Sequence, residues 1–171
     1  MDDKNELRIW AKNLRKQFNI HEVSEILAEK IRNNPRYLNS KNVMLFYPMK
    51  YEINLLSLLN DNKNFYLPRV NGYDLEVCPY SEGDKLVKSE FGVLEPLNEA
   101  INSSILDIVI VPALLVSKDG YRLGYGGGFY DRFIAKFGNN FKTIVPICKE
   151  LIIDSLPVED YDKKIDCIIH T

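Results

Sequence analysis

Residues 122–131 read RLGYGGGFYD, and this segment follows the most apolar run of the chain and leads directly into a helical pattern. Four of its five central positions are glycine, so the backbone can take positive φ angles and approach a ligand closely. A helix that starts after such a loop presents unpaired N–H groups and the positive end of its dipole. The segment therefore predicts a strand, loop and helix unit that binds an anion, with phosphate as the natural ligand.

The glycine segment matches neither of the common nucleotide motifs. No Lys-Ser/Thr pair follows at the spacing of a P-loop, and Phe129 stands in the place of the third glycine of the dinucleotide fingerprint. A loop that glycine only makes flexible or tightly turned stays open as the alternative. Asp131, in the first helical turn, could stabilise the helix end or hold Mg²⁺ against bound phosphates.

The hydrophobic pattern on both sides of this segment predicts an α/β fold. Short apolar or β-branched runs bounded by turn residues, which are typical of strands, occupy residues 43–47, 65–67, 75–80, 107–111, 143–147 and 167–169. Residues 53–59 and 130–137 have helical length and spacing. Strands that alternate with helices indicate a largely parallel sheet covered on both faces. Residues 75–93 are expected to form an antiparallel excursion.

An amphipathic helix is predicted at the N-terminus. Its apolar residues recur at helical spacing, and four basic residues recur every fourth position on a neighbouring face: Leu7, Trp10, Leu14 and Phe18, with Lys4, Arg8, Lys12 and Lys16. A solvated face whose long side chains cover apolar surface explains the basic residues. The alternative is a set of cations that neutralise a polyphosphate held by the glycine loop.

A second helix is predicted to start near His21. Asn19 followed by Glu22 resembles a capping box, which marks a helix start. The apolar residues expected to be buried along this helix are Val23, Ile26, Leu27 and Ile31. Pro35 ends or interrupts it.

Composition restricts the class of protein. A chain of 171 residues with 46% hydrophobic content fits one domain, 1–171. A net charge of −2 and a sequence pI of 5.8 argue against a nucleic-acid partner. No signal-peptide pattern or membrane-length apolar run is present, so we expect a cytoplasmic protein with no membrane partner. The protein is also expected to be a monomer. Cys78, Cys148 and Cys167 are predicted to be reduced core thiols.

These residues resemble the 5-formyltetrahydrofolate cyclo-ligases, also called methenyltetrahydrofolate synthetases, nearly from end to end. The strongest landmark is the stretch RLGYGGGFYDR at residues 122–132. The others, in chain order, are Lys4-x-x-Leu7-Arg8, Tyr47, Glu52, Leu67-Pro68-Arg69, Phe91-Gly92-Val93-Leu94-Glu95-Pro96, Val111-Pro112, Leu156-Pro157 and Asp162-x-x-x-Asp166. The chain departs from the family's usual residues at Ala113, Val116-Ser117, Leu151 and His170.

The resemblance implies a Rossmann-like three-layer α/β/α fold with a mostly parallel central sheet and an N-terminal helical segment. It also implies closure of 5-formyltetrahydrofolate to 5,10-methenyltetrahydrofolate with MgATP, through an N5-iminium phosphate, with release of ADP and phosphate. ATP would lie between the N-terminal helix and the glycine loop, and folate in an adjoining pocket.

The resemblance assigns a role to each site residue. ATP would be bound by Lys4, Asn5, Glu6, Leu7, Arg8, Arg122, Leu123, Gly124, Tyr125, Gly126, Gly127, Gly128, Phe129 and Tyr130. Folate would be bound by Arg8, Tyr47, Glu52, Tyr125, Gly126, Gly127, Gly128 and Phe129. Lys4, Arg8 and Arg122 would be catalytic, and Asp131 and Asp162 would hold Mg²⁺. The small-molecule substrates would be the only partners.

Two other functions are compatible with parts of the sequence. A relative without catalytic activity could use the same cleft to bind folate or nucleotide as a regulator. A nucleic-acid-binding module could use the basic edge of the first helix, although the acidic pI of 5.8 and the lack of an RNA motif argue against it. Taken alone, Tyr47, Glu52 and Asp162 also suit a core aromatic, a solvated charge and a turn residue.

Overall fold

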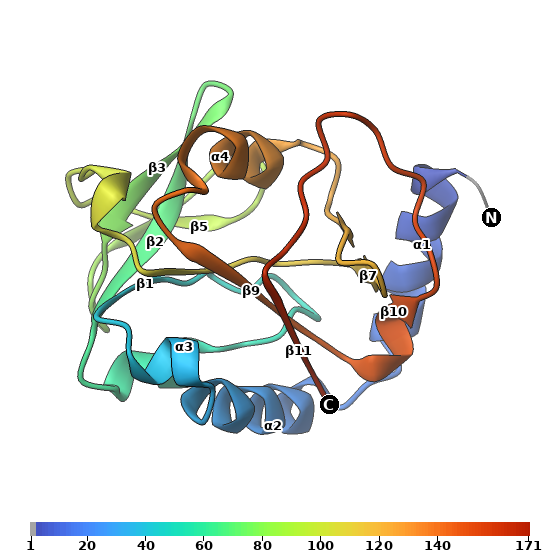
Figure 1. The fold of residues 1–171 in the computed structure, drawn as a ribbon. Helices are drawn as coiled ribbons and strands as arrows, with labels where there is room; N and C mark the ends of the chain where they lie inside the picture. Colours follow the sequence, from blue (N-terminus) through green and yellow to red (C-terminus); the bar gives the residue numbers. More distant parts are fainter. Residues whose placement is uncertain (1–2) are drawn as a thin grey trace.

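The computed structural model describes residues 3–171. Its α-helices are α1 (Lys4–Arg15), α2 (Ile20–Arg32), α3 (Pro35–Leu38) and α4 (Phe129–Phe137) (Figure 1). Its strands are β1 (Asn42–Met44), β2 (Asn64–Asn71), β3 (Asp74–Pro79), β4 (Leu86–Lys88), β5 (Leu94–Pro96), β6 (Ile108–Ile110), β7 (Leu115–Ser117), β8 (Arg122–Leu123), β9 (Lys142–Ile147), β10 (Ile152–Ile153) and β11 (Cys167–His170). Short 3₁₀ turns cover Leu56–Asn60 (η1), Ser103–Ile105 (η2) and Lys149–Leu151 (η3).

Six strands form the central sheet in the order β11-β9-β6-β1-β2-β3. Every neighbouring pair is parallel except β2 and β3, which are antiparallel. Val43 in the middle of the sheet pairs with Phe65 on one side and Ile108 on the other. The predicted α/β class and mostly parallel sheet are confirmed.

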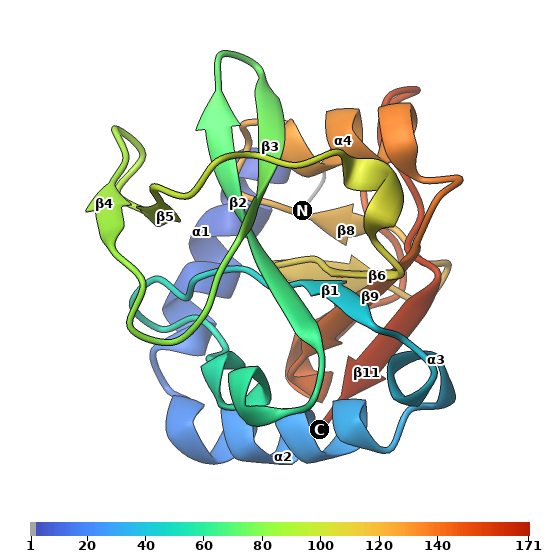
Figure 2. The ribbon, with the colours of Figure 1, turned by 90° about the vertical axis from the view of Figure 1, so that its left-hand side faces the viewer.

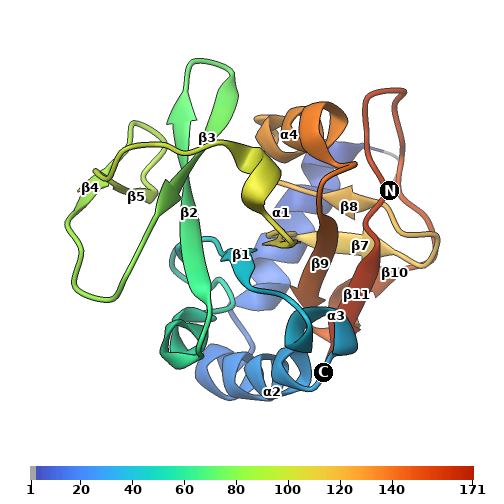
Figure 3. The same ribbon diagram turned by 60° about the vertical axis from the view of Figure 1, so that its left-hand side comes forward.

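Helices cover both faces of this sheet, as Figures 1 and 3 show. Side chains of β1 and of Leu45, which follows it, alternate between two buried clusters: Val43 and Leu45 pack on the side of α2 and α3, and Met44 packs on the side of α1 and α4. This alternation is what the two-residue period of a strand requires when both faces are buried. The second face also carries a small sheet of order β10-β7-β8.

The antiparallel excursion predicted at residues 75–93 is present, since β3 runs antiparallel to β2 and β4 runs antiparallel to β5. Strands β4 and β5 pair with each other outside the main sheet and project to one side of the molecule (Figure 2). The Glu95 carboxylate accepts a 2.6 Å hydrogen bond from the Val70 amide, and Arg69 Nη1 donates to the Pro96 and Asn98 carbonyls at 3.1 and 2.9 Å. These bonds anchor the hairpin to β2.

Residues 53–59 are not the helix that the pattern predicted. Only the 3₁₀ turn η1 forms there, and the Asn54 side chain accepts a 3.0 Å hydrogen bond from the Leu56 amide just before it. Ile53, Leu55 and Leu58 are nevertheless buried. A short apolar run can be buried without being helical, because so few residues do not compensate for the cost of helix nucleation.

Two predicted core residues are partly exposed. Trp10 is 36% exposed and Ile26 is 40% exposed. The buried residues of α1 are instead Leu7, Ala11 and Arg15. Cys78 and Cys148 are buried free thiols as predicted, whereas Cys167, on the edge strand β11, is only partly buried.

The strand before the glycine loop also differs from the expectation. The loop follows β8, which pairs with β7 in the small sheet, and not the apolar run that forms β6 in the main sheet. In the part of the chain from residue 3 onward, no helix combines the length and apolar character needed to cross a membrane.

Candidate active site

One large cavity, with a volume of about 1410 Å³, brings together most of the predicted site residues. Predicted residues that line it are Lys4, Asn5, Arg8, Tyr47, Glu52, Arg122, Leu123, Gly124, Tyr125, Gly126, Gly127, Gly128, Phe129, Tyr130, Asp131 and Asp162. Pockets for one small ligand typically measure about 300–1000 Å³, so this one can take two. Glu6 and Leu7 do not line it: Glu6 is exposed and Leu7 packs in the core.

Helix α1 is joined to the glycine loop by Arg8. Its Nε atom donates a 2.9 Å hydrogen bond to the Gly124 carbonyl, and its Nη1 atom donates to Asn5 Oδ1 at 2.8 Å. A side chain on Gly126 would lie 3.5 Å from the Arg8 guanidinium carbon. The basic edge of α1 therefore faces the glycine loop at Arg8, a proximity that sequence spacing could not establish.

The glycine loop needs its glycines for two different reasons. Gly126 and Gly128 have φ angles of 109° and 69°, which side chains rarely tolerate. A Cβ atom on Gly127 would come within 2.7 Å of the Phe129 ring. Gly128 is the N-cap of α4 and provides no capping side chain, so the first amides of this nine-residue helix are available to an anion.

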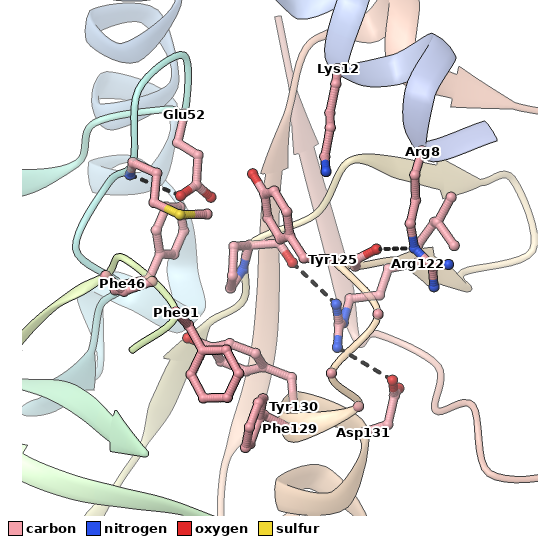
Figure 4. Close-up of a pocket in the computed structure, with 18 of the residues that line it drawn as sticks. Arg8, Lys12, Phe46, Glu52, Phe91, Arg122, Tyr125, Phe129, Tyr130 and Asp131 are labelled. Carbon is pink, nitrogen blue, oxygen red and sulfur yellow. Dashed lines mark hydrogen bonds and ion pairs between the residues drawn. The ribbon is translucent and has the colours of Figure 1, made fainter. Parts of the chain in front are cut away.

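Arg122 is a buried cation behind the loop. Its Nη2 atom lies 3.5 Å from Asp131 Oδ2, its Nη1 donates to the Pro112 carbonyl at 3.3 Å, and its guanidinium lies over the Tyr130 ring (Figure 4). Within residues 3–171 its Nε atom has no hydrogen-bond partner. Burial lowers the pKa of Arg122, and the Asp131 charge opposes this shift. A guanidinium stays charged in proteins, so this incompletely paired cation favours an anion in the cavity.

The two predicted metal ligands lie on neighbouring segments. Asp131 Oδ1 accepts a 3.2 Å hydrogen bond from the Lys163 amide, which ties the start of α4 to the segment that carries Asp162. Asp162 Oδ2 accepts bonds from Lys4 Nζ at 2.7 Å and from the Glu159 amide at 2.8 Å. Burial would lower the pKa of Lys4, but the carboxylates of Asp162 and Glu159 more than offset this effect and the pKa is raised.

Asp131 and Asp162 fit a Mg²⁺ site only when a bound molecule supplies further oxygen atoms. Asp131 and Asp162 supply hard oxygen atoms, and among the described residues the bonds to Asp162 engage Oδ2 alone. No group of three or more His, Cys, Asp or Glu residues that could hold a metal ion occurs in residues 3–171. One or two carboxylates, phosphate oxygens and waters are a usual coordination sphere for Mg²⁺, so the pair fits a metal that arrives with a nucleotide.

Glu52 is buried, which excludes the interpretation of it as a solvated charge. Its Oε1 atom accepts a 2.9 Å hydrogen bond from the Met49 amide (Figure 4). Burial raises the pKa of Glu52, while the Met49 amide, the Arg15 charge and the Tyr125 hydroxyl oppose the shift. Tyr47 lines the same cavity, as does Phe91 of the β4–β5 hairpin, whose ring meets the Phe129 ring edge to face at 5.5 Å.

Sequence reasoning missed Arg15. This side chain lines the cavity, although the residue is only 6% exposed. Its Nη1 atom donates to the Tyr125 hydroxyl at 2.7 Å and its Nε atom donates to the Tyr51 carbonyl at 3.1 Å. Arg15 lies seven residues, two helical turns, after Arg8, and this spacing was the signal that could have found it.

Comparison with known proteins gives the family. The sequence model of the 5-formyltetrahydrofolate cyclo-ligase family matches residues 2–171. The 5-formyltetrahydrofolate cyclo-ligase of Haemophilus influenzae is 28% identical over 157 residues, which cover 83% of this chain and 82% of that protein. The mouse protein of the same name is 28% identical over 165 residues, 86% and 81% of the two chains.

Solved structures agree. The NMR structure of Aquifex aeolicus 5,10-methenyltetrahydrofolate synthetase has a TM-score of 0.83 and 27% identity, covering 98% of this chain and 89% of that one. The Mycoplasma pneumoniae 5,10-methenyltetrahydrofolate synthetase, with a TM-score of 0.76 and 20% identity over 98% of both chains, shares the fold. With the match over nearly its whole length, the chain belongs to the 5-formyltetrahydrofolate cyclo-ligase family.

Proposed function

We propose that this protein converts 5-formyltetrahydrofolate to 5,10-methenyltetrahydrofolate, with MgATP as the second substrate and ADP and phosphate as the other products. Family membership supports the ligase reaction. The observation that carries the finer assignment is the Arg8–Gly124 hydrogen bond, which joins the basic edge of α1 to an uncapped, glycine-lined helix N-terminus in a cavity with room for two ligands.

The chemical difficulty lies in the formyl group, whose oxygen is a poor leaving group. In the proposed first step that oxygen attacks the γ-phosphorus of ATP, the bond from the γ-phosphorus to the bridging oxygen breaks, and ADP leaves. The product is an N5-iminium phosphate. In the second step the N10 lone pair attacks the formyl carbon, the carbon–oxygen bond breaks, and phosphate leaves. N10 also releases its proton, which completes the balance of the reaction. No protein nucleophile is needed.

The protein's part in these steps is alignment and charge neutralisation. The phosphates would be bound by the amides at the start of α4 and by the guanidinium groups of Arg8 and Arg122. Lys4, which bonds Asp162, lines the same cavity. Asp131 and Asp162 would hold Mg²⁺, which when bound neutralises phosphate charge. The buried carboxylate of Glu52 and the aromatic rings of Tyr47, Tyr125 and Phe129 supply the surface for the folate.

Product stoichiometry and isomer selectivity test this assignment. One ADP and one phosphate should form per methenyltetrahydrofolate, because one phosphoryl transfer activates one formyl oxygen. 10-Formyltetrahydrofolate should not react by this route, since its formyl group is bonded to N10 and not to N5. Tight binding of folate or nucleotide without product would favour the alternative of a regulator that lacks catalytic activity.

A further inference from the structure

Arg15 connects three parts of the molecule through one buried side chain. It belongs to α1, it donates to the hydroxyl of Tyr125 in the glycine loop at 2.7 Å, and it donates to the carbonyl of Tyr51 at 3.1 Å. Both acceptors lie on segments that line the large cavity. Arg8 also links α1 to the glycine loop, but its side-chain bonds within residues 3–171 go to Gly124 and Asn5. Arg15 instead spans from this loop to the turn at residues 49–52.

The turn at residues 49–52 is held in a conformation of high energy. Tyr51 has a φ angle of 66°, the left-handed region that residues other than glycine rarely adopt, and in residues 3–171 it is the single non-glycine case. Such a residue persists when its surroundings over-determine it. Here the Glu52 amide donates to the Met49 carbonyl at 3.0 Å, the Met49 amide donates to the Glu52 carboxylate at 2.9 Å, and Arg15 fixes the Tyr51 carbonyl between them.

The groups that face Glu52 come from three elements. Arg15 on α1 and Tyr125 in the glycine loop favour its ionised form, and Tyr130 at the start of α4 also couples to its charge. An ionised carboxylate is an acceptor for the amino and ring N–H groups that a folate carries. Arg15 thus affects both where Glu52 lies and how readily it carries its charge.

We propose that Arg15 is a positioning residue for the folate substrate: its guanidinium fixes the Tyr125 hydroxyl and the turn that carries Glu52, and so sets the separation of the two folate-contacting segments. This inference rests on the proposed function. Arg15 acts through Tyr125 and Glu52, and the loss of its side chain should impair the use of folate much more than the use of ATP.

The test compares Arg15→Gln and Arg15→Lys with Arg32→Gln as a matched control. Arg32 is also a helical arginine that bonds a carboxylate, Asp61, and a carbonyl, Ser57, and it does not line the cavity. We expect Arg15→Gln to raise KM for folate about tenfold or more, the effect of losing hydrogen bonds to a charged group, with KM for ATP little changed. Arg32→Gln should lower thermal stability and leave both KM values unchanged.

The pH profile gives a readout that a purely structural role would not change. Without the Arg15 charge the pKa of Glu52 rises further, so the acidic limb of kcat/KM for folate should move to higher pH in Arg15→Gln. Arg15→Lys keeps a positive charge and should restore the limb while leaving part of the KM defect. Equal increases in both KM values with an unmoved limb, or wild-type behaviour, would overturn the proposal.

Tyr125→Phe covers the case in which Arg15→Gln does not fold. This variant deletes only the hydroxyl that accepts from Arg15. It should raise KM for folate, and the double variant Tyr125→Phe/Arg15→Lys should be less impaired than the two single effects combined. If the two single effects on KM for folate simply added in the double variant, Arg15 and Tyr125 would not act together. If the wild-type protein binds 5-formyltetrahydrofolate without turnover, the proposed reaction fails, and the same comparisons made on folate dissociation constants still decide the role of Arg15.

Discussion

Arg8 and Gly124 are 116 positions apart in the sequence, yet the Arg8 Nε atom donates a 2.9 Å hydrogen bond to the Gly124 carbonyl. Neither the helix nor the loop alone identifies a nucleotide site, since basic helix faces and glycine turns are both common. Together they place a guanidinium beside backbone amides that have no capping side chain. This juxtaposition is the basis for assigning ATP to this side of the cavity.

Lys4→Ala and Arg8→Ala should each raise KM for ATP about tenfold, because each removes a cation from the proposed phosphate site. Arg8→Ala should also raise KM for folate, since Arg8 lies against Gly126, which both ligands are expected to contact. Steady-state kinetics with each substrate varied in turn provides the measurement. Lys136→Ala, which removes an exposed ion pair with Asp74 outside the cavity, is the control. Two variants indistinguishable from Lys136→Ala would make the basic edge a solvated face.

Gly126→Val should abolish most ATP use, because it forces a β-branched residue to a φ angle of 109° beside Arg8. The strain alone costs about 1–3 kcal/mol of folding stability. Gly83→Val makes a matched control: Gly83 has a φ angle of 92°, open space around it and no place in the cavity lining. Both variants should lose similar stability by thermal unfolding, and only Gly126→Val should lose ATP affinity. Equal ATP affinity in the two would remove the loop from the phosphate site.

Asp131→Asn and Asp162→Asn should each increase the Mg²⁺ concentration needed for half-maximal rate and lower kcat, with little change in folate binding. The reason is that each substitution keeps the size of the side chain and removes a charged oxygen ligand. Asp74→Asn, at an exposed ion pair, controls for general charge effects. If Asp131 only pairs with Arg122 and the Lys163 amide, Asn should lower stability and leave the Mg²⁺ requirement unchanged. Magnesium titrations at fixed ATP that coincide with wild type for both variants would rule out the metal site.

Glu52→Gln should separate stability from function. Burial raises the pKa of Glu52 above its ordinary value of 4.5, so the folded protein binds this proton more tightly than the unfolded chain does. The charged form therefore costs folding stability at pH values above the raised pKa, and this cost disappears as the pH falls below 4.5. At neutral pH the variant should unfold at the same temperature as wild type or higher, yet show a raised KM for folate. A less stable variant with a normal KM would give Glu52 a structural role.

The central sheet could be predicted because both of its faces are buried. β-branched and apolar runs such as residues 107–111 and 143–147 became β6 and β9 nearly at the expected bounds. Elsewhere the apolar pattern gave wrong predictions. Ile53, Leu55 and Leu58 are buried although residues 53–59 do not form an α-helix, and Trp10 of α1 is partly exposed. Periodicity reports which residues avoid water more reliably than which element they form.

The chemistry of the site was harder to predict because it depends on contacts between distant segments. The family resemblance named the glycine loop, Glu52 and Asp131, and the structure brings all three to one cavity. Arg15 was not predicted because the basic residues recur at a spacing of four, and this spacing leads from Lys12 to the exposed Lys16. A buried guanidinium is recognisable only when its acceptors, Tyr125 and Tyr51, are seen.

Formation of 5,10-methenyltetrahydrofolate, followed by its absorbance, tests the central claim most directly. The purified protein is mixed with 5-formyltetrahydrofolate in three parallel reactions: with MgATP, without nucleotide, and with ATP plus excess chelator for Mg²⁺. The account predicts rapid appearance of the methenyl product in the first reaction and almost none in the other two. Product at the full rate without nucleotide, or none with MgATP from protein that binds both substrates, would contradict it.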